Sequence, residues 1–176
     1  MKFLRLYIKN LSKYDFVQQF NYKNISDIPR LEKIVLSFEY KTPTYRQILS
    51  SLIALELISK VKPSLLTLKK SNVVLKLRAG SPVGCKVTLR KLKMLDFITT
   101  LFLILIPQDK YFRISVPKKN SSSSLSLDLK SLFLFDELKG NYYLLKNLNN
   151  LSVVLVTSTK NFSEFLFFMK TLKVNI

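Results

Sequence analysis

Histidine is absent from this 176-residue chain, cysteine occurs once and glycine three times. Without histidine the chain lacks the usual general base, the serine–histidine pair of many hydrolases and the commonest metal ligand. The single cysteine, Cys85, excludes an internal disulfide and a cysteine-rich zinc site, and we expect it to be a small buried apolar residue. These absences argue against an enzyme and predict no cofactor and no metal.

Acidic residues are scarce, and none lies between Glu56 and Asp96. The cations in that interval are Lys60, Lys62, Lys69, Lys70, Lys76, Arg78, Lys86, Arg90, Lys91 and Lys93. Over the whole chain, 29 lysines and arginines stand against 11 aspartates and glutamates, which leaves a formal net charge of +18. Charge of this size repels itself in a compact molecule and favours a polyanionic partner, above all nucleic acid. A merely solvated basic surface is the alternative.

Long hydrophobic runs are also missing. The longest, residues 97–106, has about ten residues, whereas a helix that crosses a bilayer needs about twenty. We therefore expect a core helix there and no membrane partner. Hydrophobic residues make up 48% of the chain, enough for a packed core, and the length predicts one domain over residues 1–176.

The spacing of apolar residues predicts helices and strands in alternation. Helices are expected over residues 1–20, 44–59, 91–106 and 162–172, and strands over 33–38, 73–78, 86–90, 125–130 and 152–157. Thr42 is expected to cap the second helix, with Pro43 at its first position and an apolar stripe of Tyr45, Ile48, Leu49, Leu52 and Ile53. Residues 117–124 are expected to be a flexible Lys/Asn/Ser loop. This order predicts an α+β fold, a mostly antiparallel sheet with helices packed on one face.

The strands over 73–78 and 86–90 are expected to form a hairpin around a turn at residues 80–84. The two-residue period of a strand places Lys76 and Arg78 on one side of the first arm, and Lys86, Thr88 and Arg90 on one side of the second. One face of the sheet is therefore expected to be positively charged. An ordinary half-exposed hairpin shows the same alternation and is the alternative.

A long motif resembles a known family. Lys69-Lys70-Ser71 and the run 75–90 (LKLRAGSPVGCKVTLR) are similar to protein five of the large ribosomal subunit, the 5S-rRNA-binding family of bacteria and organelles. Further similar segments follow in the family's order at residues 20–22, 29–34, 62–63, 94–97, 107, 112–113, 133–138 and 153–160. The resemblance covers nearly the whole chain.

The resemblance implies a role without chemistry in the central protuberance of the large subunit. The partners it implies are large-subunit rRNA, 5S rRNA, peptidyl-site tRNA, neighbouring large-subunit proteins and a small-subunit head protein. The residues expected to bind RNA, through phosphates and 2′-hydroxyls, are Arg30, Lys33, Lys62, Lys69, Lys70, Ser71, Lys86, Thr88, Arg90, Lys91 and Lys93. The loop expected near tRNA consists of Lys76, Arg78, Ala79, Gly80, Ser81 and Pro82.

Composition adds a hint about the gene. Ala54 and Ala79 are the only alanines, and alanine and glycine codons are rich in G and C, whereas the abundant Leu, Lys, Phe, Ile and Asn have AT-rich codons. The motif at residues 20–22 also lies as far from Met1 as the family's short leading helix places it, which leaves no room for a transit peptide. We therefore expect a mitochondrial, organelle-encoded protein of the matrix ribosome. A plastid or an AT-rich bacterium is the alternative.

Some positions depart from the family's pattern. Ser37 and Glu39 stand where the family has Asn, often followed by Gly, and Lys60-Val61 stands where it has Gly-Gln. The Gly ahead of its Phe-Lys motif is Val74, and its Phe-Asp-Gly-Arg-Gly-Asn loop has become residues 118–120 followed by serines. Because Glu39 repels phosphate and polar groups are lost, the 5S contact is expected to be weaker than the hold on large-subunit rRNA.

Two other classes of function are compatible with a basic chain. A basic enzyme that processes nucleic acid is disfavoured by the missing histidines and by scattered acids such as Asp136 and Glu137, which we expect to be solvated. A peripheral protein on an anionic membrane needs only positively charged amphipathic helices. These remain alternatives to the ribosomal interpretation.

Overall fold

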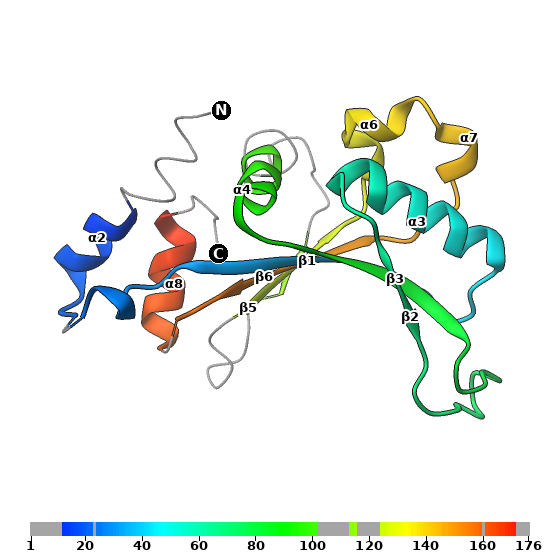
Figure 1. Ribbon diagram of the computed structural model, residues 1–176, viewed down its shortest axis with the longest axis horizontal. Helices are drawn as coiled ribbons and strands as arrows, with labels where there is room; N and C mark the ends of the chain where they lie inside the picture. Colours follow the sequence, from blue (N-terminus) through cyan, green and yellow to red (C-terminus); the bar gives the residue numbers. More distant parts are fainter. Residues whose placement is uncertain (1–11, 23, 102–112, 116–123, 160, 172–176) are drawn as a thin grey trace.

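A computed structural model describes residues 12–22, 24–101, 113–115, 124–159 and 161–171 (Figure 1). The described residues form one six-stranded sheet with the order β2-β3-β1-β6-β5-β4, in which every pair of neighbours is antiparallel. The strands are β1 (Leu31–Glu39), β2 (Ser64–Thr67), β3 (Pro82–Leu89), β4 (Arg113–Ser115), β5 (Ser124–Leu129) and β6 (Leu151–Thr157). The predicted α+β class is confirmed.

Helices pack along one side of this sheet (Figure 1). They are α2 (Ser12–Gln19), α3 (Tyr45–Ser59), α4 (Lys91–Thr100), α6 (Asp136–Lys139), α7 (Tyr142–Leu145) and α8 (Phe162–Thr171), with short 3-10 turns at Ile25–Asp27 and Leu132–Leu134. The strand between α7 and α8 is the central β6, which pairs with both β1 and β5. The helix layer therefore covers a sheet whose middle strands come from both halves of the chain.

The core lies between the sheet and the helix layer. Ile34, Leu36 and Phe38 of β1 are fully buried, and β5 and β6 alternate in the same way, with every second residue inside. This period of two places all the large apolar side chains of each strand on one face. The predicted strands over 125–130 and 152–157 are confirmed by this pattern.

The first turn of α3 differs from the prediction. Thr44, and not Thr42, is the N-cap: its side chain accepts a hydrogen bond from Gln47 N at 3.4 Å, and Thr44 N donates to Gln47 Oε1 at 3.0 Å. This reciprocal pair is a capping box, which needs a glutamine or glutamate three residues after the cap. Pro43 therefore precedes the cap and lies outside the helix.

The predicted apolar stripe of α3 is wrong in part. Tyr45, Leu49 and Ile53 are exposed, and Ile48 is the stripe residue that is buried. The side chains that α3 buries are Ile48, Ser50, Ser51, Ala54, Leu55, Ile58 and Ser59. Small residues allow the helix to approach the sheet closely, and their hydroxyls are satisfied locally, as in the bonds from Ser51 Oγ to Ile48 O and from Ser59 Oγ to Leu55 O.

The predicted hairpin is also wrong in one arm. β3 contains most of the predicted second arm, but its partner is β2 at Ser64–Thr67, and residues 73–78 belong to the loop between them. Pro82 and Gly84, expected in the turn, lie inside β3. The pairing of β2 with β3 supplies the backbone hydrogen bonds, so the apolar residues 73–75 are left at the loop without a strand partner.

The remaining elements follow the prediction where they are described. The helix expected over 1–20 is described only as α2, and the one over 91–106 only as α4, in which Met94 and Phe97 are buried, as is the following Leu101. Leu105 and nearly all of the loop expected at 117–124 lie outside the described residues. In α8, Phe165 and Met169 are buried as expected, whereas Phe162 and Leu166 are half-buried.

Cys85 is fully buried, as predicted, and its Sγ lies 3.0 Å from Ser51 Oγ. Burial raises the pKa of the Cys85 thiol above its ordinary value of 9.0. The folded state therefore holds the thiol proton more tightly than the unfolded state. Its contribution to stability is complete below the unfolded pKa and is lost as the pH rises through the folded one.

We expect the free energy of unfolding to fall as the pH rises above about 8.5, the ordinary range of a thiol. Urea unfolding at a series of alkaline pH values measures it. Cys85→Ser is the control: it should cost about 1 kcal/mol at neutral pH, the low end for a buried hydroxyl because Ser51 offers a partner, and should flatten the alkaline decline. An equally steep decline in the variant would assign the effect to other groups.

Gly84 lies where β1 and β3 approach most closely. A Cβ added there would collide with the backbone oxygen of Phe38, which belongs to the neighbouring strand and cannot move aside. Gly140, after α6, has helical angles (φ −64°, ψ −22°) and open space around its Cα. These two glycines thus form a matched pair for substitution.

Gly84→Ala should lower the free energy of unfolding by about 1 to 3 kcal/mol, because the strands must separate to admit the methyl group. Gly140→Ala should leave it unchanged or raise it by up to about 1 kcal/mol, since alanine restricts the unfolded chain. Chemical denaturation of both variants tests this. Equal effects at the two positions would contradict the packing of β3 on β1.

Candidate nucleic-acid interface

All ten cations between Glu56 and Asp96 are exposed in the fold. They follow β3 from end to end and continue into the loop that precedes it. We call this set, Lys60, Lys62, Lys69, Lys70, Lys76, Arg78, Lys86, Arg90, Lys91 and Lys93, the cationic ribbon. β3 itself has eight residues, roughly 26 Å at 3.3 Å per residue, so the ribbon is long enough to meet several successive phosphates.

The middle of the ribbon lies on the sheet face opposite the helices. Lys86 and Thr88 point outward from β3, while Cys85, Val87 and Leu89 point into the core, as the sequence predicted. Lys86 lies between two serines, Ser37 of β1 and Ser64 of β2. Small neighbours leave the lysine and threonine as the prominent groups there, which suits contact with a sugar–phosphate backbone.

Charges on the rest of this face are few. Lys33 of β1 is half-buried and lies opposite Val156 of β6. Further along, Asp128 of β5 accepts a hydrogen bond from Ser152 Oγ at 2.6 Å. Glu39 ends β1 and is exposed. Positive charge is therefore concentrated on the β3 side of the sheet.

The loop 68–81 extends away from the helix layer (Figure 1). Its base is closed by hydrogen bonds from Leu68 N to Ser81 O at 3.0 Å and from Gly80 N to Leu68 O at 2.8 Å. Gly80 has φ +83°, a conformation that favours glycine. Further out, Asn72 and Leu77 exchange two backbone hydrogen bonds of 2.9 and 3.0 Å. The loop is thus an ordered projection that carries Lys69, Lys70, Ser71, Lys76 and Arg78 outward.

The tip of this loop was missed by the sequence prediction. Val73 and Val74 are 88% and 90% exposed, because the four residues between Asn72 and Leu77 form a turn and not a strand. Lys76, in the same turn, has φ 53°. Of the residues predicted to approach tRNA, Lys76 lies in this turn, Arg78, Ala79, Gly80 and Ser81 lie nearer the base, and Pro82 begins β3.

A second group of cations lies at the other end of β3. Lys93 Nζ donates to the carbonyl of Lys60 at 3.0 Å, which ties the end of α3 to the start of α4. Lys60 and Lys91 both have a positive φ, 53° and 54°. Arg90 lies between β3 and α4, and Lys62 follows α3. Arg30, whose backbone exchanges hydrogen bonds with Ser158, lies apart from them before β1.

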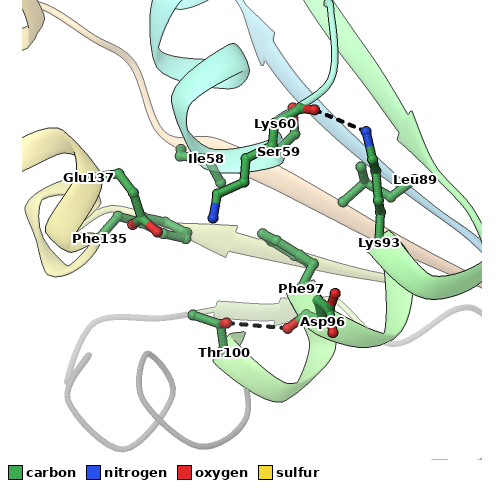
Figure 2. Close-up of a pocket in the computed structure, with 10 residues that line it drawn as sticks. All are labelled: Ile58, Ser59, Lys60, Leu89, Lys93, Asp96, Phe97, Thr100, Phe135 and Glu137. Carbon is green, nitrogen blue, oxygen red and sulfur yellow. Dashed lines mark hydrogen bonds between the residues drawn. The ribbon is translucent and has the colours of Figure 1, made fainter. Parts of the chain in front are cut away.

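A cavity of about 280 Å³ opens beside this second group (Figure 2). Its walls include Ile58, Phe97 and Phe135, and the Lys60 ammonium points into it. Asp96 and Glu137 also line the cavity, and a carboxylate repels phosphate. The cavity therefore does not belong to the phosphate-binding surface, which lies outside it along β3.

The placement of acidic residues and the length of the helices bear on metal and membrane sites. Within the ranges given above, no group of three or more histidine, cysteine, aspartate or glutamate residues is placed to hold a metal ion. No helix in the same ranges is long and apolar enough to cross a bilayer. Asp136 and Glu137 are exposed, as predicted, and Asp136 pairs with Lys139.

Comparison with known proteins gives consistent matches. Residues 82–176 match the model of the ribosomal uL5 family C-terminus. The chain is 34% identical to large ribosomal subunit protein uL5 of Clostridium acetobutylicum over 84% of this chain and 83% of that protein. It is 35% identical to the uL5 of Geotalea daltonii (90% and 89% covered) and 29% identical to the uL5m of Reclinomonas americana (93% and 92% covered).

Exposure of Lys76 and Arg78 allows a charge reversal that leaves the core untouched. We expect Lys76→Glu with Arg78→Glu to weaken RNA binding and to lower the slope of log affinity against log salt by about 1 to 2, since each phosphate contact contributes roughly 0.7 to 0.9. Filter binding to large-subunit rRNA at several salt concentrations measures both. Lys13→Glu with Lys170→Glu, the same charge change on exposed residues of the helix layer, is the control. Loss of the native circular dichroism in the loop variant would refute the placement of these residues.

Proposed function

This chain belongs to the uL5 family of large-ribosomal-subunit proteins, and we propose that it holds rRNA in the central protuberance through its cationic ribbon. Members of this family are structural constituents of the ribosome and not enzymes. The observation that carries the proposal is the ribbon itself, in which ten exposed cations follow one strand and its loop with no carboxylate between them in sequence. Only a polyanion neutralises such a surface over its whole length.

Large-subunit rRNA is the first partner that we assign to the ribbon. Lys86, Thr88 and Arg90 project along one side of β3, so a duplex groove or strand laid along it meets phosphates and 2′-hydroxyls in sequence. Lys62, Lys91 and Lys93 extend the contact beyond the end of β3. Arg30 and Lys33 reach a separate part of the RNA, because they lie on β1 and before it.

5S rRNA is the second partner, with a smaller share of the contact. Ser37 is 7% exposed and offers little surface, while the exposed carboxylate of Glu39 repels phosphate at the end of β1 nearest the loop. The family's Asn at this place is therefore replaced by groups that bind RNA less well. Large-subunit rRNA and neighbouring proteins hold the chain more firmly in this proposal.

The loop 68–81 is proposed to approach the peptidyl-site tRNA. It is the described segment that projects furthest from the sheet and helices, and its closed base keeps the tip in a fixed position (Figure 1). A contact with a small-subunit head protein completes the set of partners that the family implies. We place this ribosome in the mitochondrion, on the similarity to the uL5m of Reclinomonas americana and the AT-type composition.

Crosslinking inside intact ribosomes tests this proposal. After ultraviolet crosslinking, we expect RNA fragments attached to residues 60–93 to come from large-subunit rRNA, with tRNA fragments on the loop and fewer 5S fragments. Peptides with Lys139 and Lys170, on the helix layer, serve as the control and should carry little RNA. A ribbon without crosslinked RNA, or a chain absent from large subunits washed at moderate salt, would sink the proposal.

A further inference from the structure

An exposed apolar surface lies in the helix layer, away from the ribbon. It consists of Tyr45, Leu49 and Ile53 of α3 and Tyr142, Tyr143 and Leu144 of α7, and we call it the α3–α7 surface. The side chains are between 45% (Ile53) and 83% (Tyr45, Tyr143) exposed. Clustered exposure of this kind on a soluble fold marks an interaction site more often than chance.

The two parts of the α3–α7 surface are held together. Ser50 Oγ of α3 donates a hydrogen bond to the carbonyl of Leu144 at 2.8 Å, so α7 lies against the flank of α3 next to Ile53 (Figure 1). The α3 residues follow each other at intervals of four and therefore share one face of the helix. On α7, the Tyr142 ring contacts Phe133 at 4.8 Å between centroids and Tyr143 at 6.2 Å. The surface is thus one preformed patch.

RNA does not suit this surface. Its aliphatic members, Leu49, Ile53 and Leu144, offer no flat ring on which a base can stack, and burying them requires apolar atoms on the partner. The cations that RNA needs are arranged along β3 and the loop. A protein side-chain surface is therefore the better match.

The charges around the patch indicate the sign of that protein. Residues 40–55 and 138–150 carry Lys41, Arg46, Lys139 and Lys146 and no carboxylate. A second copy of this chain is disfavoured, since a two-fold interface would bring the same cations together between molecules of net charge +18. A partner that offers carboxylates beside its apolar side chains complements the surface.

We propose that the α3–α7 surface is the docking site for a carboxylate-bearing amphipathic segment of another protein in the ribosome. Leu49, Ile53 and Leu144 supply the apolar centre, the tyrosines supply area with few side-chain torsions to fix, and Arg46 and Lys146 pair with the acidic rim of the segment. The function of this surface goes beyond rRNA binding, because its residues are separate from the ribbon.

A photo-crosslinking amino acid identifies the occupant. p-Benzoylphenylalanine replaces Leu49 in one version of the protein, Tyr143 in a second and Leu92 in a third; Leu92 is an exposed leucine on α4, outside the surface, and is the control. In intact ribosomes, we expect positions 49 and 143 to crosslink to one polypeptide, at a segment that combines apolar residues with Asp or Glu. Position 92 should not crosslink to that segment.

A double variant then tests the energetics. Leu49→Ser with Ile53→Ser should lower the amount of the crosslinked polypeptide in purified particles about tenfold or more, since truncating central anchors typically costs at least that factor in affinity. Leu92→Ser should leave it unchanged. The amount of this chain in the particles is measured alongside, so failure of its own rRNA binding is distinguished from failure of the docking site.

Several results would overturn the inference. Crosslinks from positions 49 and 143 to RNA, to a second copy of this chain, or to a segment without carboxylates would each assign another occupant. An absence of crosslinks in ribosomes that contain the chain would show an unoccupied surface. An unchanged amount of the crosslinked polypeptide with the double variant would show that the contact does not depend on the apolar centre.

Discussion

Uncompensated positive charge is the constraint that shapes this molecule. A chain with a net charge of +18 must still bury a core, and it does so by dividing the residues of its strands between two environments. β3 shows the division most clearly: Cys85, Val87 and Leu89 pack inside, while Lys86 and Thr88 face outward. One strand therefore helps to hold the fold and presents the charge that RNA neutralises.

This division separates the two faces of the protein by chemistry. The open sheet face and the loop 68–81 carry cations, and the helix layer carries the exposed apolar residues of α3 and α7. α3 can expose Leu49 and Ile53 because it packs on the sheet through small residues, Ser51 and Ala54 among them. RNA on one face and a protein on the other then cause no competition for the same side chains.

Local patterns predicted most of the fold, and long-range pairing explains the errors. The alternation of Leu125, Leu127 and Leu129 needs no partner to be recognised, so β5 was found. Residues 73–78 also alternate, but only the pairing of β2 with β3 decides which segment is a strand, and that pairing joins residues far apart in the chain. The ribbon was predicted from charge and motif, whereas the α3–α7 surface was hidden because an apolar stripe looks the same whether it faces the core or the solvent.

Backbone strain links the charge to the history of the chain. Lys60, Lys76 and Lys91 all have φ near 53°, where glycine is favoured, and the family pattern expects glycine in place of Lys60. Drift towards AT-rich codons replaces glycine by lysine at a cost of roughly 1 kcal/mol for each strained residue, against a total stability of about 5 to 15 kcal/mol. Each such lysine also adds a charge to the ribbon. Because RNA binds the folded state and not the unfolded one, the added charge offsets the strain only when the chain is assembled on its RNA.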